Sequence, residues 1–89
     1  MADDDVPDDL VQLKRSFWAA DKQCAELADR PDSTDPEVQA AMNAELSAAR
    51  AERSRITTGL YAHPWWATQA NRYQADQRVN AAARALDSA

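Results

Sequence analysis

Side chains suited to acid–base, nucleophilic or metal chemistry are few and scattered in this sequence. His63 is the only histidine and Cys24 the only cysteine. A nucleophile needs a neighbouring base, and a metal site needs several clustered ligands. No Glu-x-x-His pair occurs, and one glycine excludes a glycine-rich phosphate loop. We therefore expect a protein that is not an enzyme and takes no metal, cofactor or small-molecule substrate.

Aromatic side chains gather instead around residues 57–66, which include Gly59, His63 and the adjacent Trp65 and Trp66. Large aromatics in a short chain usually fill the core, so these rings are expected to close the end of a helical bundle. Neighbours on a helix point about 100° apart, which also favours one ring turned outward toward a protein partner. The candidate protein-binding residues are Trp65, Trp66, Tyr61, Tyr73 and Arg53.

Arg53 interrupts a stripe of apolar residues. It either pairs with Asp9 at the end of the bundle or is held for the carboxylate or phosphate of a partner.

The arginines suggest an alternative function, a nucleic-acid-associated regulator. Arg72, Arg78 and Arg84 are spaced six residues apart, so they point in three directions and form no basic stripe. A patch across the second and third helices stays open, although the net charge of −5 opposes it. The candidate nucleic-acid-binding residues are Arg50, Arg53, Arg55, Arg72 and Arg78.

The elements that must position these residues are helices. Alanine, glutamate, glutamine and arginine are abundant, and no run alternates β-branched with polar residues. A proline-marked break at residues 30–36 and a second at 59–64 divide the chain into three. We predict an all-α, antiparallel up-down-up three-helix bundle with helices over about residues 7–29, 36–58 and 64–87. Gly59 is expected to close the second helix in the left-handed conformation.

The first helix carries two apolar lines and therefore needs two neighbours. Its heptad-like seam comprises Leu10, Leu13, Phe17, Ala20, Cys24 and Leu27, and its second line Val11, Trp18 and Ala25. The short link makes the second helix antiparallel to the first, and pairing about that link sets Leu27 near Val38 and Leu10 near Ile56.

The third helix has a weak apolar face. After Tyr73 its only large apolar residues are Val79 and Leu86. Its first half is expected to dock firmly, and its second half to be loose or to lie in an oligomer interface.

The chain ends and its composition indicate where such a protein acts. Residues 1–6 are expected to form an acidic disordered tail, and residues 7–89 a single helical domain. The tail lacks the apolar run of a signal peptide, no stretch is apolar enough for a membrane span, and a lone cysteine suits a reducing compartment. We expect a cytoplasmic, non-enzymatic protein-protein interaction module, regulatory or adaptor in role. Its partner is another protein or itself, as a homodimer or higher oligomer built on coiled-coil-like seams.

Overall fold

The structure is a computed structural model that describes residues 6–87. It contains three α-helices and one short 3-10 helix: α1 (Asp8–Ala28), α2 (Pro36–Tyr61), η2 (Pro64–Thr68) and α3 (Arg72–Asp87). Residues 6–87 contain no β-strand. The predicted all-α fold with three packed helices is confirmed. The first helix and the start of the second lie within one residue of their predicted bounds.

The second helix is longer than predicted, because it continues through Gly59 to Tyr61. Gly59 does not adopt a positive φ. The Thr57 and Thr58 hydroxyls donate to the carbonyls of Arg53 and Ser54, so both threonines fit the helix. The helix ends where Pro64 forces His63 into an extended conformation (φ −61°, ψ 132°). Proline, and not glycine, therefore sets this boundary.

The single helix predicted for residues 64–87 was wrong, since the structure divides it in two. The 3-10 helix η2 ends at Thr68, the next residue Gln69 is extended (φ −100°, ψ 130°), and α3 begins only at Arg72. The Asn71 side chain accepts a hydrogen bond from the Gln74 backbone (3.1 Å) and so caps α3. This break lets α3 change direction relative to η2.

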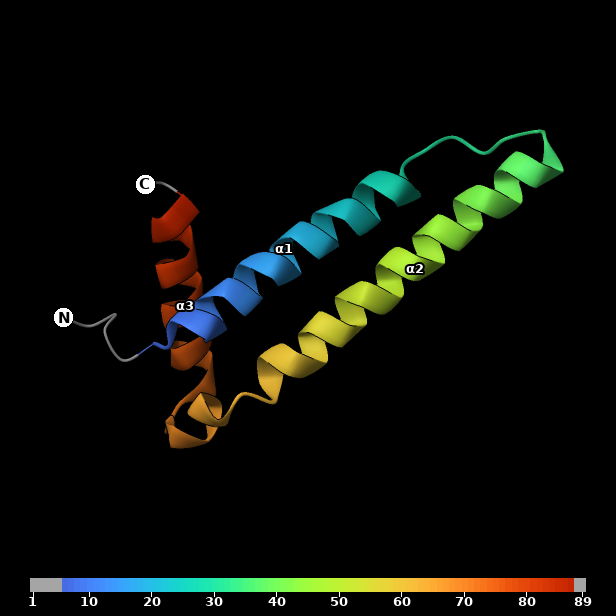
Figure 1. The fold of residues 1–89 in the computed structure, drawn as a ribbon. Helices are drawn as coiled ribbons and strands as arrows, with labels where there is room; N and C mark the ends of the chain where they lie inside the picture. Colours follow the sequence, from blue (N-terminus) through green and yellow to red (C-terminus); the bar gives the residue numbers. More distant parts are fainter. Residues whose placement is uncertain (1–5, 88–89) are drawn as a thin grey trace.

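Helix α1 is the central element, because it packs against both α2 and α3. In Figure 1, α3 crosses α1 near the N-terminal end of α1 and does not run along the hairpin of α1 and α2. The second apolar line faces α3 only over Val11 and Trp18, whereas Ala25 is exposed. The prediction of two neighbours for α1 is therefore confirmed, with the second neighbour covering only its first half.

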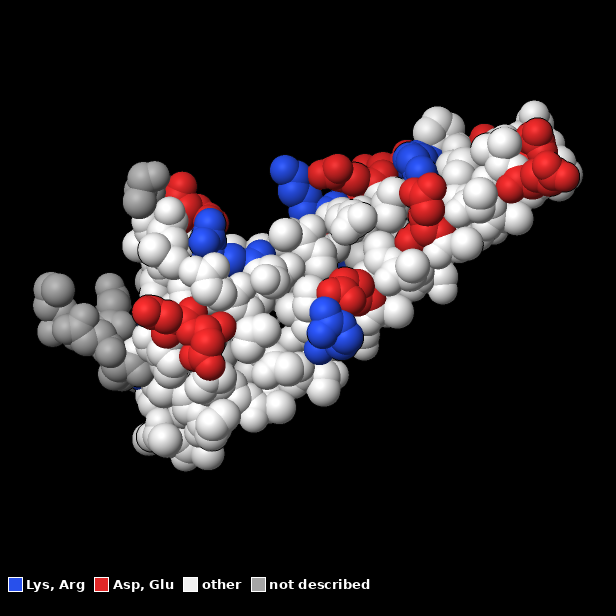
Figure 2. Space-filling model, in the orientation of Figure 1, with Lys and Arg blue, Asp and Glu red and all other residues white. Residues whose placement is uncertain are grey.

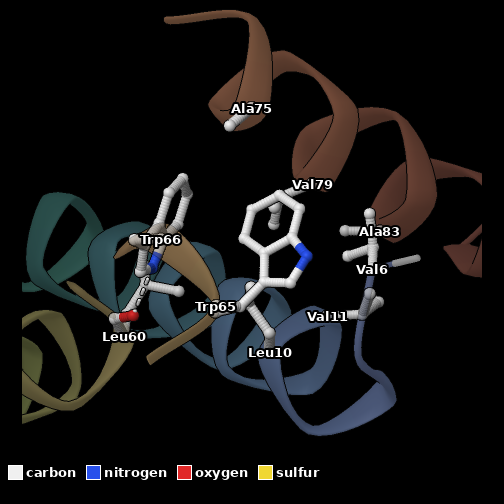
Figure 3. Close-up of a cluster of buried hydrophobic side chains, with 9 residues drawn as sticks. All are labelled: Val6, Leu10, Val11, Leu60, Trp65, Trp66, Ala75, Val79 and Ala83. Atoms are coloured by element: carbon white, nitrogen blue, oxygen red, sulfur yellow. Dashed lines mark hydrogen bonds between the residues drawn. The ribbon is translucent and has the colours of Figure 1, made fainter. Parts of the chain in front are cut away.

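A single apolar cluster joins all the elements at this crossing (Figure 3). Its buried members are Val6, Leu10, Val11, Leu60, Trp65, Trp66, Ala75, Val79 and Ala83. Val6, assigned to the tail from the sequence, is 5% exposed, and residues 1–5 lie outside the described residues. Val79 and Ala83 are completely buried, so the second half of α3 is not the loose element that its composition suggested. The small side chains of Ala75 and Ala83 allow α3 to approach α1 closely.

The hairpin extends far beyond this cluster. The Cα radius of gyration is 16.6 Å and the longest dimension 55 Å, whereas a compact domain of this length has a radius of gyration of about 12 Å. In Figure 1, α2 begins beyond the end of α1. We call residues 6–17 and 55–87 the base, and residues 26–42, which form the far end of the hairpin, the tip.

The register of the hairpin differs from the predicted pairing. Arg53 pairs with Asp21 (2.9 Å) and Glu45 with Arg30 (3.3 Å). The prediction had placed Arg53 opposite the region of Asp9. Compared with the predicted pairing, the observed pairs displace α2 by about two helical turns along α1, so that the start of α2 lies beyond the C-terminal end of α1. Val38 consequently lies beyond α1 and is 46% exposed, instead of packing on Leu27.

We expect Gly59→Ala to stabilise the protein by about 0.5–1 kcal/mol, because alanine has less backbone entropy to lose in a helix. A Cβ atom at this position would meet no atom within 4 Å. Thermal or urea unfolding measures the difference. A loss of stability would mean that residue 59 needs a conformation that alanine disfavours.

Candidate protein interaction surface

The corner between α2 and η2 is organised by His63. Its Nδ1 accepts a hydrogen bond from the Trp65 backbone (3.1 Å) and so caps η2. With Nδ1 accepting, a neutral ring carries its proton on Nε2, which lies 3.1 Å from Asp9 Oδ2. This hydrogen bond is the main cause that lowers the pKa of the Asp9 carboxyl. His63 thus joins the corner to the first turn of α1.

Both tryptophans of the corner are buried, each 8% exposed. Trp66 Nε1 donates to the Leu60 carbonyl (2.8 Å), and the two indoles meet edge to face with ring centroids 5.2 Å apart (Figure 3). Adjacent rings are both covered because η2 has neighbours on two sides, α1 and α3. Trp65 and Trp66 therefore hold the base together, and the exposed aromatic surface of the corner belongs to other residues.

Those residues are Tyr61 and Tyr73, which are 38% and 73% exposed. Arg72, which precedes Tyr73 in the chain, is also exposed, and its guanidinium carbon is 5.3 Å from the Tyr61 ring centroid and 5.5 Å from that of Trp66. We call Tyr61, Arg72 and Tyr73 the corner surface. Within residues 6–87, Arg72 makes cation–π contacts but no hydrogen bond or ion pair. Its donors are therefore oriented by the rings and open to a partner.

An ion pair between a buried lysine and a partly exposed aspartate lies behind this surface. Lys14 is 5% exposed, and its Nζ lies 3.2 Å from Asp76 Oδ1. The same carboxylate accepts hydrogen bonds from the Tyr61 hydroxyl and from Asn80 Nδ2, each at 3.5 Å. Lys14 also lies 5.7 Å and 5.8 Å from the ring centroids of Phe17 and Tyr61. Residues from α1, α2 and α3 meet here, so the pair fixes where α3 crosses α1.

The sequence offered no signal for this pair. Lys14 belongs to neither apolar line, and sixty-two positions separate it from Asp76. Only the crossing of α3 over α1, which follows from the break at residues 69–71, brings the two side chains together.

Most charged side chains of the arm between base and tip form ion pairs, one of them with Arg55 at the edge of the base. Arg53 binds Asp21 across the hairpin instead of the predicted Asp9, because of the shifted register. Arg55 forms an ion pair with Glu52, three residues before it. The hydrogen bond that the Arg55 side chain donates to the Glu52 carboxylate lowers the pKa of that carboxyl. Figure 2 shows such adjacent groups of opposite sign along this face of the arm.

The arginines considered for nucleic-acid binding are separated by this arrangement. Arg53 and Arg55 are neutralised by carboxylates, and Arg50 is exposed on the arm. Arg72 and Arg78 lie at the base, over the rings of Trp66 and Trp65. Nucleic-acid binding stays a prediction that no contact in the described residues supports.

Net charge changes along the molecule. The tip holds five carboxylates and one arginine, a net charge of −4, and Figure 2 shows acidic side chains gathered at its far end. The base holds four carboxylates against one lysine and five arginines, a net charge of +2 with His63 neutral. The middle of the arm is balanced, so the molecule is an acidic tip joined to a basic base.

Comparison with known proteins gives a family without an assigned activity. A family model described as a domain of unknown function (DUF8825) matches residues 9–86. No curated protein and no solved structure matches the chain. Among residues 6–87, no helix is long and apolar enough to cross a membrane, and no group of three or more potential metal ligands occurs.

We expect Asp76→Asn to destabilise the protein by about 2–3 kcal/mol, because it leaves the Lys14 ammonium buried without a counter-charge. Asp87→Asn is the matched control, since it removes the exposed Arg15–Asp87 pair (2.9 Å) and should cost about 1 kcal/mol or less. Urea unfolding measures both. Adding Lys14→Met to Asp76→Asn should recover at least half of the loss. Equal effects of the two Asp→Asn variants would show that the buried pair has no special role.

Proposed function

The chain belongs to the family of domains of unknown function DUF8825, and from its exposed surface we propose that it is a self-associating protein-protein interaction module. It would act in the cytoplasm, as a regulatory or adaptor component and not as an enzyme. The observation that carries this proposal is the tip, where α2 extends past α1 and Val38 is left 46% exposed.

The incomplete covering of the arm and of the tip supports the proposal. Leu27, Met42 and Leu46 are only partly buried, whereas the base has a closed core of its own. A shallow groove of about 340 Å³ between α1 and α2 is lined by Leu27, Ala49 and charged or small side chains, and is open to solvent. Ala20, Cys24 and Ala49 are buried between α1 and α2. Because α3 covers only the base, the larger side chains farther out along the hairpin are left partly exposed to a partner.

A second copy of the chain suits this surface. Two hairpins that lie side by side form a four-helix bundle, in which each covers the seam of the other. An isologous pair buries the same patch on both subunits and closes after two, so it does not grow into fibres. The apolar seam between α1 and α2 would then continue across the interface in the manner of a coiled coil.

The sedimentation coefficient should rise with protein concentration from the micromolar to the millimolar range. Val38→Ser should weaken the association about thirtyfold, because about 1 kcal/mol of apolar burial is lost at each of the two Val38 side chains of the dimer. Leu86→Ser is the matched control: Leu86 is also 46% exposed, but it lies near the C-terminal end of α3 and should have no effect. A protein that stays monomeric throughout this range would contradict the proposal.

A further inference from the structure

The distribution of charge and of exposed apolar residues allows a more specific statement, which rests on the proposed self-association. We infer that two copies pair antiparallel, so that the acidic tip of each hairpin docks on the corner surface (Tyr61, Arg72 and Tyr73) of the other. The partner is a second copy of this chain, and the interface contains two identical tip-to-corner contacts.

Electrostatics favours this orientation over a parallel one. A parallel pair would bring together two tips of net charge −4 and two bases of net charge +2. An antiparallel pair puts each tip against a base of opposite sign. Because the middle of the arm has no net charge, it opposes neither arrangement. The orientation is therefore decided at the two ends of the molecule.

The apolar residues are arranged in the same way. Four large hydrophobic side chains are exposed in residues 6–87: Val38, Tyr61, Tyr73 and Leu86. One lies at the tip, and two belong to the corner surface. An antiparallel pair brings Val38 of each copy to the tyrosines of the other, so that both are removed from water. Tyrosine and arginine are the residue types that contribute most to binding at interfaces.

Arg72 gives the corner surface its preference for carboxylates. Its guanidinium rests on two aromatic rings and has no polar partner within residues 6–87. A planar guanidinium held in place loses little entropy when it binds a carboxylate through two hydrogen bonds. Asp29 and Asp32, at the tip, form no side-chain hydrogen bond or ion pair in the described structure. The Arg72 guanidinium at one end of the molecule and the Asp29 and Asp32 carboxylates at the other end are therefore both available to a second copy.

Charge reversal at each end tests the orientation. The base variant is Arg72→Glu, and the tip variant is Asp29→Arg/Asp32→Arg. Both variants agree with the helix dipoles. The glutamate introduced at position 72 lies in the first turn of α3, and the arginine introduced at position 29 lies at the C-terminal end of α1. Arg50→Glu is the control, because Arg50 is an exposed arginine in the middle of the arm. Circular dichroism verifies that each variant is folded, and sedimentation at low salt measures association.

Each variant alone should associate about tenfold more weakly than the wild type, since like charges then meet at both contacts. An equimolar mixture of the base and tip variants should associate about as strongly as the wild type, because both contacts then join opposite charges. Arg50→Glu should change association less than threefold.

A mixture that associates no better than its components would overturn the antiparallel inference. If the wild type still dimerises in that case, self-association stands and only its orientation is rejected. A wild type that never dimerises would reject the proposed function itself, so the two failures are distinguishable.

Discussion

The length of the second apolar line on α1 is the constraint on which the rest of the structure depends. Val11 and Trp18 give α3 a surface to cover, but Asp21 and Lys22 follow, and Ala25 is exposed. A crossing helix therefore buries the first half of α1 and has no apolar surface to follow further. The base acquires a closed core, and the remainder of the hairpin is only two helices thick.

Polar contacts fix this crossing in one position. Apolar alanine surfaces such as Ala75 and Ala83 allow several orientations of α3, because they have few distinguishing shapes. The Lys14–Asp76 pair joins α1 to α3, and the Tyr61 hydroxyl of α2 bonds the same carboxylate, so these contacts require all three helices to be in place. The aromatic corner supplies buried apolar surface from η2, and the ion pair adds polar contacts between α1 and α3.

Much of the fold could be predicted from local sequence patterns. Heptad spacing and proline-marked breaks predicted three helices, and the two lines on α1 predicted its two neighbours. The end of α2 was misjudged because glycine was taken as the stop, whereas Pro64 and the helix-compatible hydroxyls of Thr57 and Thr58 decide it. The register of the hairpin was missed because it depends on the conformation of the link at residues 29–35. The site depends on the break before α3, so neither the Lys14–Asp76 pair nor the burial of both tryptophans could be deduced from spacing.

Amide hydrogen exchange at several protein concentrations tests most directly whether base and arm are stabilised separately. At low concentration, amides of Leu10, Leu60 and Val79 should exchange most slowly, and those of residues 38–46 much faster. Raising the concentration should protect the amides of residues 38–46 and of the corner surface, because both lie in the proposed interface. If the amides of Leu10, Leu60 and Val79 exchange faster than those of residues 38–46 in the monomer, the account is contradicted.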